Sequence, residues 1–257
     1  MRIGLIAGSG LEQLYEDRIG RPTAVDTAYG HAPVFMLDAD DREVVFLPRH
    51  GRGHSIPPHR INYRANIRAL ERLGCECVIA TNAVGSMNPE MQPGDFVICD
   101  QFLDFTKQRP LTFFDGEEGQ VRHVDVTDPY CPRLREHLAQ TCRRSVGEAP
   151  HNTGTYVCAE GPRFETPAEI EMYTKLGGDV VGMTGVPEVV LAREAGLCYA
   201  TVCIVSNAAA GMTGAQISHD EVIELMDERR PTLHKLLRAA LETVEPDATC
   251  SCRSPFG

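Results

Sequence analysis

Six short turns of the sequence carry glycines or polar side chains, and each one follows an apolar run. The turns span residues 8–10, 49–51, 82–85, 161–165, 183–185 and 206–211. The apolar runs before them have the length and composition of strands that are buried on both faces. Ligands of an open α/β sheet bind at the carboxyl ends of its strands, so we expect these turns to converge on one pocket.

The first turn, Gly8-Ser9-Gly10, is compatible with three interpretations. Its glycines and the Ser9 hydroxyl suit a cradle for an oxyanion, in which exposed backbone N–H groups act as donors. A tight turn without a ligand is the second interpretation. A dinucleotide fingerprint is the third, but Gln13 stands where its third glycine belongs, although Asp26 lies at a suitable distance for a ribose carboxylate. The absence of a Gly-Lys-Ser/Thr motif excludes a P-loop.

Arg49 and His50 form the second polar turn. Arginine binds phosphate oxygens through its planar fork, which favours an oxyanion site at this strand end. His50 and His54 have the spacing of a helical zinc pair, but glycines interrupt the segment and no glutamate follows the first histidine. The segment by itself leaves an oxyanion site and a solvated surface loop equally open.

Composition narrows the class of protein. A net charge of −11 over 257 residues argues against a large nucleic-acid footprint, so a substrate phosphate needs a locally positive pocket. No Gly-x-Ser-x-Gly elbow is present, which argues against a serine hydrolase. The first residues lack the apolar core of a signal peptide, and no stretch is long and apolar enough to span a membrane. We therefore expect a cytoplasmic protein without membrane partners.

The chain contains ten cysteines, most of them inside apolar runs. We expect them to be reduced core residues of a cytosolic protein. Two Cys-x-Cys pairs, Cys75/Cys77 and Cys250/Cys252, lack the Cys-x-x-Cys spacing of zinc sites. The second pair has the chemistry to oxidise, but we expect it to lie in a frayed chain end.

The strands that position the polar turns follow from the same apolar pattern. We expect them at residues 2–7, 43–48, 77–81, 95–99, 154–159, 179–183 and 199–205. Their alternation with helical patterns predicts an α/β fold, with a mixed, mostly parallel β-sheet flanked by helices. No linker or repeat divides the chain, so we expect a single domain over residues 1–245, followed by a tail over residues 246–257.

Three helices carry clear signals. One, over residues 63–73, buries an apolar stripe and ends at Gly74. Thr166 opens a second helix through a capping box, with proline at the first helical position and glutamate three residues after the threonine. Ser218 opens the last helix through a similar box. Pro231 is expected to kink or divide that last helix.

Taken together and in this order, the turns resemble one family, the purine nucleoside and methylthioadenosine phosphorylases. The resemblance rests on residues 6–11, 49–66, 82–85, 160–166 and 182–189. Each motif is weak alone, whereas the ordered set is highly specific. The resemblance implies cleavage of a purine nucleoside by phosphate to a free base and a sugar 1-phosphate, in purine salvage. It also implies trimers or dimers of trimers, and no metal or organic cofactor, because phosphate is a co-substrate.

Matching positions give the residue roles that the resemblance implies. The implied phosphate site consists of Ser9, Arg49, His50, Asn82, Ala83 and Thr184. The implied nucleoside site consists of Phe164, Glu165, Met183, Asn207, Ala208, Ala209 and His219. Met183 is expected beneath the ribose and Phe164 against the base, while Asn207 and His50 are the expected catalytic residues. His123 matches a position that reaches a neighbouring subunit's site.

Three of these positions depart from the aminopurine branch of the family. That branch has aspartates where Asn207 and Ala209 stand and a serine where Glu165 stands, so the changes resemble the 6-oxopurine branch. Inosine and guanosine carry an N1–H donor that suits the Glu165 carboxylate, whereas adenine N1 would face it lone pair to lone pair. Asn207 is expected to donate to N7 or O6 while negative charge develops on the base and phosphate captures the cationic sugar.

His219 is expected in the first turn of the last helix, where the helix N-terminus disfavours a positive imidazolium. A neutral His219 hydrogen-bonds a 5′-hydroxyl well, so we expect inosine and guanosine to be preferred over methylthioinosine. Alternatives within the class are phosphorylases of S-methyl-5′-thioinosine or 5′-methylthioadenosine. Outside it, a dinucleotide-binding oxidoreductase and a non-catalytic nucleoside-binding module stay open.

Overall fold

The computed structural model describes residues 2–8, 23–39, 42–116, 119–214, 218–245 and 247–256. Within these ranges, the side chains of Asp38, Ala39, Arg52 and His219 are not described. Ser9, expected in the phosphate site, lies outside the described residues.

The described residues form one ten-stranded sheet. Its main path runs β2 (Thr23–Thr27), β3 (Gly30–Ala39), β4 (Arg42–Pro48), β1 (Arg2–Ala7), β5 (Cys75–Ser86), β9 (Val180–Gly182), β8 (Thr155–Ala159) and β7 (Gln101–Phe105). Off this path, β10 (Cys198–Ala208) pairs with β5, and β6 (Phe96–Ile98) pairs with β10. The central pairs β4–β1, β1–β5, β5–β10, β9–β8 and β8–β7 are parallel. The expectation of a mixed, mostly parallel sheet is therefore confirmed.

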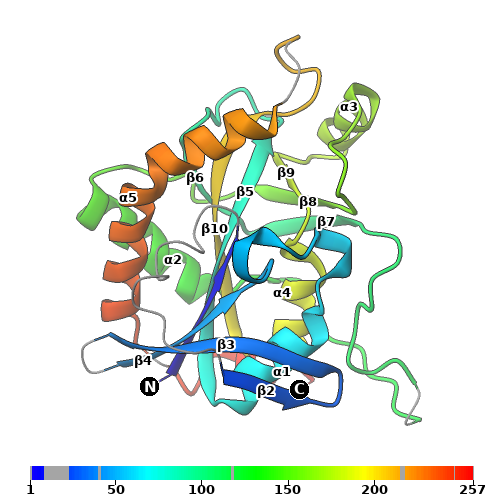
Figure 1. Ribbon diagram of the computed structural model, residues 1–257, viewed down its shortest axis with the longest axis vertical. Helices are drawn as coiled ribbons and strands as arrows, with labels where there is room; N and C mark the ends of the chain where they lie inside the picture. The colour runs from blue at the N-terminus through cyan, green and yellow to red at the C-terminus, as the bar shows by residue number, and fades with distance from the viewer. Residues whose placement is uncertain are drawn as a thin grey trace.

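Helices cover both faces of the sheet (Figure 1). They are α1 (Tyr63–Arg72), α2 (Pro132–Thr141), α3 (Pro167–Lys175), α4 (Gly185–Glu194) and α5 (His219–Thr243). The apolar residues of α1 and α4 share one core cluster, and those of α2 and α5 share the other. Among the described residues, no helix combines the length and the apolar character that crossing a bilayer requires.

Every strand expected from an apolar run is present, with shifts at the ends. β5 is longer than expected, since it continues to Ser86 and reaches β9. The sequence missed β2, β3 and β7, because none of them shows a continuous apolar run. β2 and β7 contain no buried residue, and the described residues of β3 mix buried and exposed positions. β2 and β7 are the first and last strands of the main sheet path, so each of them pairs with one neighbouring strand of that path.

The helix starts agree with the sequence signals, with one change of partner. Thr166 opens α3 through the expected reciprocal capping box. Ser218 caps α5, but its Oγ accepts from the amide of Asp220 at 3.2 Å rather than from that of Glu221. α5 continues through Pro231 without dividing, and Figure 1 shows a bend in the helix axis, so of the two expected outcomes, a kink or a division, the structure has the kink. Burial of its apolar face against the sheet compensates for the backbone hydrogen bond that proline removes.

The C-terminal tail is packed on the body of the protein. Its short 3₁₀ helix spans Ser251–Arg253, and the Cys252 side chain is 2% exposed. The Phe256 ring meets the Phe114 ring edge-on at 5.2 Å. The expectation of a frayed chain end is therefore wrong, because these side chains bury apolar surface that the sequence pattern did not connect to the core.

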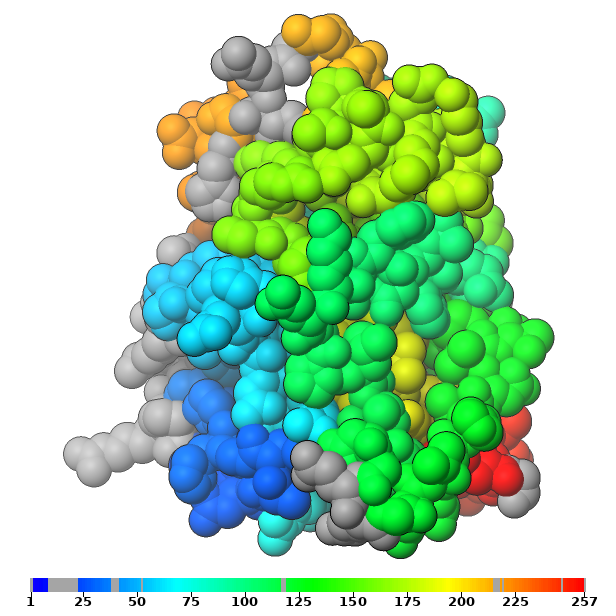
Figure 2. Space-filling view, turned by 90° about the vertical axis from the view of Figure 1, so that its right-hand side faces the viewer, coloured from blue at the N-terminus to red at the C-terminus, as the bar shows by residue number. Residues whose placement is uncertain are grey.

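The described parts of the long connection between β7 and α2 lie over the α4 side of the sheet. Figure 2 shows this connection as green spheres, with part of α4 visible in yellow between them. Arg109 Nη1 donates to the Val186 carbonyl at 2.7 Å, and the Phe113 amide donates to Glu194 at 2.8 Å. The connection carries His123, whose side chain is exposed.

Candidate active site

A cavity of about 440 Å³ lies at the carboxyl ends of the central strands. All six polar turns contribute to its wall, as their position after parallel strands predicted. The lining residues named for the site from the sequence are Arg49, His50, Asn82, Ala83, Phe164, Glu165, Met183, Thr184, Asn207 and Ala209. The structure therefore brings together most of the predicted site residues, whose roles stay predictions.

Three predicted residues are placed differently. Ala208 is not among the described residues that line the cavity, although its carbonyl accepts a hydrogen bond from Asn207. His219 begins α5 as expected, and Val222, one turn further, lines the cavity. His123 belongs to the exposed connection and does not line the cavity of its own chain.

A buried ion pair stands at the predicted phosphate site. Arg49 is 1% exposed, and its Nε and Nη2 donate to the two carboxylate oxygens of Glu188 at 2.8 and 2.7 Å. Nη1 donates to the Thr81 carbonyl at 2.8 Å, and the Tyr199 hydroxyl donates to Glu188 at 2.7 Å. Burial lowers the pKa of Arg49, but the Glu188 carboxylate outweighs this effect and the pKa is raised. Arg49 is thus a permanent cation whose charge is largely balanced inside the protein.

Gly8 follows β1 and packs against Arg49. A Cβ atom at Gly8 would lie 2.7 Å from the Thr81 carbonyl oxygen and 2.9 Å from Arg49 Nη1, so only glycine fits. The Gly8 amide donates to the Thr81 hydroxyl at 3.1 Å. This amide is therefore already paired within the protein, in contrast to the exposed donor that an oxyanion cradle needs.

His50 is held as a neutral imidazole. Its Nδ1 lies 2.9 Å from the Ile56 carbonyl oxygen, to which it donates, and its ring stacks on that of His54 at 4.1 Å. Burial, followed by the charges of Arg49 and His54, lowers the pKa of His50 to about 3. A neutral ring that donates from Nδ1 presents Nε2 as an acceptor, which suits a protonated phosphate oxygen.

Two polar contacts fix the Thr184 turn. The Thr184 hydroxyl donates to Asn82 Oδ1 at 2.7 Å, and Asn82 Nδ2 donates to the Thr201 hydroxyl at 2.7 Å. The buried Tyr156 hydroxyl accepts from the amides of Thr184 and Gly185, both at 3.2 Å. The strand end therefore holds the Thr184 side chain in one place before any ligand binds.

The sequence analysis missed three residues that support this end of the cavity, namely Tyr156, Glu188 and Thr201. Glu188 gave the one available signal, because it is a carboxylate inside the apolar segment 185–192. Nothing in the local sequence distinguishes Tyr156 or Thr201 from other core residues.

Glu165 and Asn207 supply the hydrogen-bonding groups expected to meet a base. Glu165 Oε1 is buried and has no hydrogen-bond partner among the described residues, and burial raises the pKa of the Glu165 carboxyl. Asn207 Oδ1 accepts from Ser206 at 2.8 Å, and its Nδ2 donates to the Ala208 carbonyl at 2.8 Å. One N–H of Nδ2 is left for a ligand. The site thus offers one acceptor and one donor.

The position of Asn207 depends on an irregular strand end. The register between β10 and β5 shifts between Val205 and Asn207, so the strand turns its side chain differently after the shift. Gly85 lies opposite Asn207, and a Cβ atom there would make an ordinary van der Waals contact with Asn207 Nδ2 at 3.5 Å, so this position does not require glycine. The Met183 side chain packs against Gly161, where a Cβ atom would lie only 2.6 Å from the Met183 sulfur.

Comparison with known proteins identifies the class. Residues 2–242 match the model of the phosphorylase superfamily. A 6-oxopurine nucleoside phosphorylase of Pyrococcus furiosus is 54% identical over 98% of this chain and 96% of its own. A probable S-methyl-5′-thioinosine phosphorylase of Methanothermobacter thermautotrophicus is 47% identical over 98% of this chain and 87% of its own. The crystal structure of methylthioadenosine phosphorylase from Schistosoma mansoni with adenine superposes with a TM-score of 0.88 at 34% identity, covering 94% of this chain and 91% of the other.

The chain belongs to the phosphorylase superfamily. Within it, the most similar relatives and structures are nucleoside phosphorylases, which are pentosyltransferases, so the family and the fold predicted from the motifs are confirmed. The match favours the phosphorylase interpretation of residues 8–10 over the dinucleotide fingerprint.

Substitutions in the Arg49–Glu188 pair should separate its effect on stability from its effect on phosphate binding. Arg49→Met and Glu188→Met each leave a buried charge unpaired, and each should lower the free energy of unfolding by about 3–5 kcal/mol. The double variant Arg49→Met/Glu188→Met should lose much less than the sum. Arg49→Met, alone or in the double variant, should raise the KM for phosphate about ten- to hundredfold, since a charge-assisted contact is lost.

Urea denaturation and phosphate titration measure the two effects. Arg163→Met is the matched control, because Arg163 forms a similar two-bond pair with Glu169 on the surface, and its loss should change neither quantity appreciably. Normal phosphate affinity in the double variant would show that Arg49 serves the fold only.

Proposed function

We propose that the chain is a purine nucleoside phosphorylase that cleaves 6-oxopurine nucleosides, inosine and guanosine, with phosphate to the free base and ribose 1-phosphate. The observation that carries the choice of base is the buried, unpaired carboxylate oxygen of Glu165 in the same cavity as Asn207. The name of the Pyrococcus furiosus relative supports the same activity.

The argument from Glu165 is one of matching donors and acceptors. A 6-oxopurine carries hydrogen on N1 and pairs with the carboxylate, whereas N1 of adenine carries a lone pair and leaves both groups unsatisfied. Unpaired buried polar groups cost roughly 1–3 kcal/mol each, and more when charged. A mismatch of this kind rejects a substrate by large factors.

The proposed reaction passes through a cationic sugar. Phosphate bound near Arg49, His50 and Thr184 both stabilises this cation and captures it at C1′. Asn207 donates its remaining N–H to N7 or O6 of the base as negative charge develops there. We propose that phosphate is the only co-reactant and that the reaction uses neither a metal nor an organic cofactor.

A second candidate, an S-methyl-5′-thioinosine phosphorylase, differs only at the 5′ position of the sugar. The apolar side chain of Val222, which lines the cavity from α5, favours it, as does the name of the Methanothermobacter relative. His219, one turn earlier in α5, favours the 5′-hydroxyl of inosine.

The test is base release from inosine, guanosine, adenosine, methylthioinosine and methylthioadenosine, each with and without phosphate. We expect release only with phosphate, inosine and guanosine fastest, and ribose 1-phosphate as the second product. Release without phosphate would indicate a hydrolase. Faster release from methylthioinosine than from inosine would establish the second candidate.

Glu165→Gln should lower kcat/KM for inosine about tenfold, because a neutral acceptor replaces a charged one. The ratio of adenosine to inosine cleavage should rise, since the amide can donate to N1. In the native protein, activity on inosine requires ionised Glu165, so the raised pKa should move the acid loss of kcat/KM to higher pH than for an ordinary glutamate. This acid limb should disappear in the variant.

Glu171→Gln is the control, since it removes a carboxylate from the exposed surface of α3. An unchanged adenosine to inosine ratio and an unchanged acid limb in Glu165→Gln would show that Glu165 does not read the base.

We further propose a trimer or a dimer of trimers, located in the cytoplasm and acting in purine salvage. The resemblance to the family supports the assembly, as does the exposure of His123 and of Phe164, a lining residue that is 39% exposed. The cysteines, which are unpaired thiols, suit a reducing compartment. Light scattering at assay concentrations should give three or six times the mass of the chain. An active monomer would rule out a shared site.

A further inference from the structure

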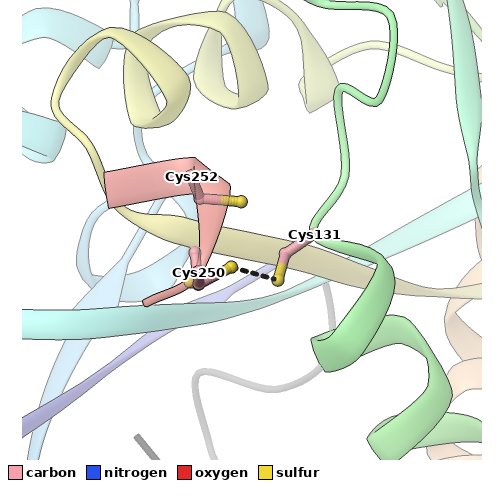
Figure 3. A group of neighbouring side chains, drawn as sticks. Cys131, Cys250 and Cys252 are labelled. Carbon is pink, nitrogen blue, oxygen red and sulfur yellow. Dashed lines mark hydrogen bonds between the residues drawn. The ribbon is translucent and has the colours of Figure 1, made fainter. Parts of the chain in front are cut away.

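Four cysteine side chains from three distant parts of the chain meet at one place. Cys131 is the N-cap of α2, Cys198 is the first residue of β10, and Cys250 and Cys252 belong to the C-terminal tail. Their four Sγ atoms all lie within 4.8 Å of one another. Figure 3 shows the Cys131 and Cys250 sulfurs facing each other, with Cys252 beside them.

The spacing of the sulfurs suits a single central ion. Four thiolates bound to zinc at about 2.3 Å in a tetrahedron have sulfurs about 3.8 Å apart. The sulfurs of Cys131 and Cys250 are 3.7 Å apart. A disulfide needs a sulfur–sulfur distance of about 2.05 Å and joins cysteines two at a time, which does not require four of them to converge.

We propose that Cys131, Cys198, Cys250 and Cys252 form a tetrahedral thiolate site for one divalent metal ion, with zinc as its ordinary occupant. All four ligands come from the protein, and three of them are buried, as in structural zinc sites that leave no position open for a substrate.

The surroundings of the cluster stabilise thiolates. Cys131 stands at the N-terminus of α2, where the partial positive charge of the helix favours an anion. Arg133 stands two residues after Cys131 in the first turn of α2, so a cation accompanies the cluster. Arg133 is in turn paired with Asp247 of the tail at 3.7 Å.

Other cysteines of the described chain lack this arrangement. Cys99 and Cys203 approach each other to 3.5 Å in the core, but these two thiols have no third ligand beside them. Among the described residues, the four-cysteine cluster is the one group of three or more metal-binding side chains that converges within such a distance. The Cys-x-Cys pair of the tail did not indicate a metal site in the sequence, because the other two proposed ligands lie far away along the chain.

The metal site would stabilise the fold and would not take part in catalysis. Cys198 and Asn207 stand near opposite ends of β10, and the eight residues between them hold the two roughly 30 Å apart. The metal would fasten the tail to the start of α2 and of β10. Its loss should therefore lower stability and leave kcat/KM for the nucleoside unchanged.

The experiment uses the full chain, reduced and purified without oxygen, then loaded with zinc and freed of excess. We expect one zinc ion per chain by elemental analysis. Cobalt loading should give the visible absorption of tetrahedral Co²⁺ together with thiolate charge-transfer bands. Zinc should raise the Tm by on the order of 10 °C over the chelator-treated protein.

Cys250→Ser should lose the bound zinc and the zinc-dependent part of the Tm, because its side chain is half-buried and the change is mild for the fold. The matched control is Cys142→Ala, which removes a fully buried thiol outside the cluster and should keep both. Thiol titration of the loaded protein after denaturation should find all ten cysteines reduced.

Three results would overturn the proposal. They are a loaded chain that retains no metal, a Tm that zinc does not change, and fewer than ten thiols in a second preparation isolated without added reductant, which would show that disulfides hold the tail. None of them bears on the phosphate-dependence assay, so the two proposals fail independently.

Discussion

The buried ion pair between Arg49 and Glu188 is the interaction on which the active site depends. It joins the end of β4 to α4, and through Tyr199 it reaches β10, so three elements meet at one pair of charges. Two charges removed from water are stable only when their geometry is good and their remaining hydrogen bonds are made, and both conditions hold here. The consequence for function is electrostatic. Because Glu188 balances Arg49, this part of the cavity holds a fixed arrangement of donors with little excess positive charge, within a chain whose net charge is −11.

The proposed recognition of the base depends on one carboxylate, that of Glu165. Glu165 lies in the turn after β8, whereas Asn207 lies after the irregular end of β10, so the two groups that would read a purine come from separate strands. Burial disfavours the charged form of Glu165, and a donor from the base would restore what burial removes. In the proposed function, the burial that destabilises this carboxylate would therefore also make it selective, because an adenine ring offers it no donor.

β10 connects the cysteine cluster to the cavity. Its first residue belongs to the cysteine cluster, its middle packs against helices on both faces of the sheet, and Ser206 and Asn207 near its end line the cavity. Expectations from sequence were accurate for this strand because it is a continuous apolar run. Neither β2 nor β7 was expected from the sequence, since these strands at the sheet ends contain only exposed and partly buried residues. The expectations were wrong for the chain end, because the burial of Cys252 depends on residues more than a hundred positions away.

The sequence by itself determined what is local along the chain. Apolar runs placed seven of the strands, the Thr166 capping box began α3, and the ordered polar turns predicted the family and ten of the residues that line the cavity. Tertiary structure alone decided which residues from distant parts of the sequence contact these local elements. Glu188 lies 139 residues from the arginine it neutralises, the Tyr156 hydroxyl holds the amides of Thr184 and Gly185, and four cysteines converge from three separate segments. Periodicity and turn chemistry act over a few residues, whereas burial of a charge or a thiol is a property of everything that folds around it.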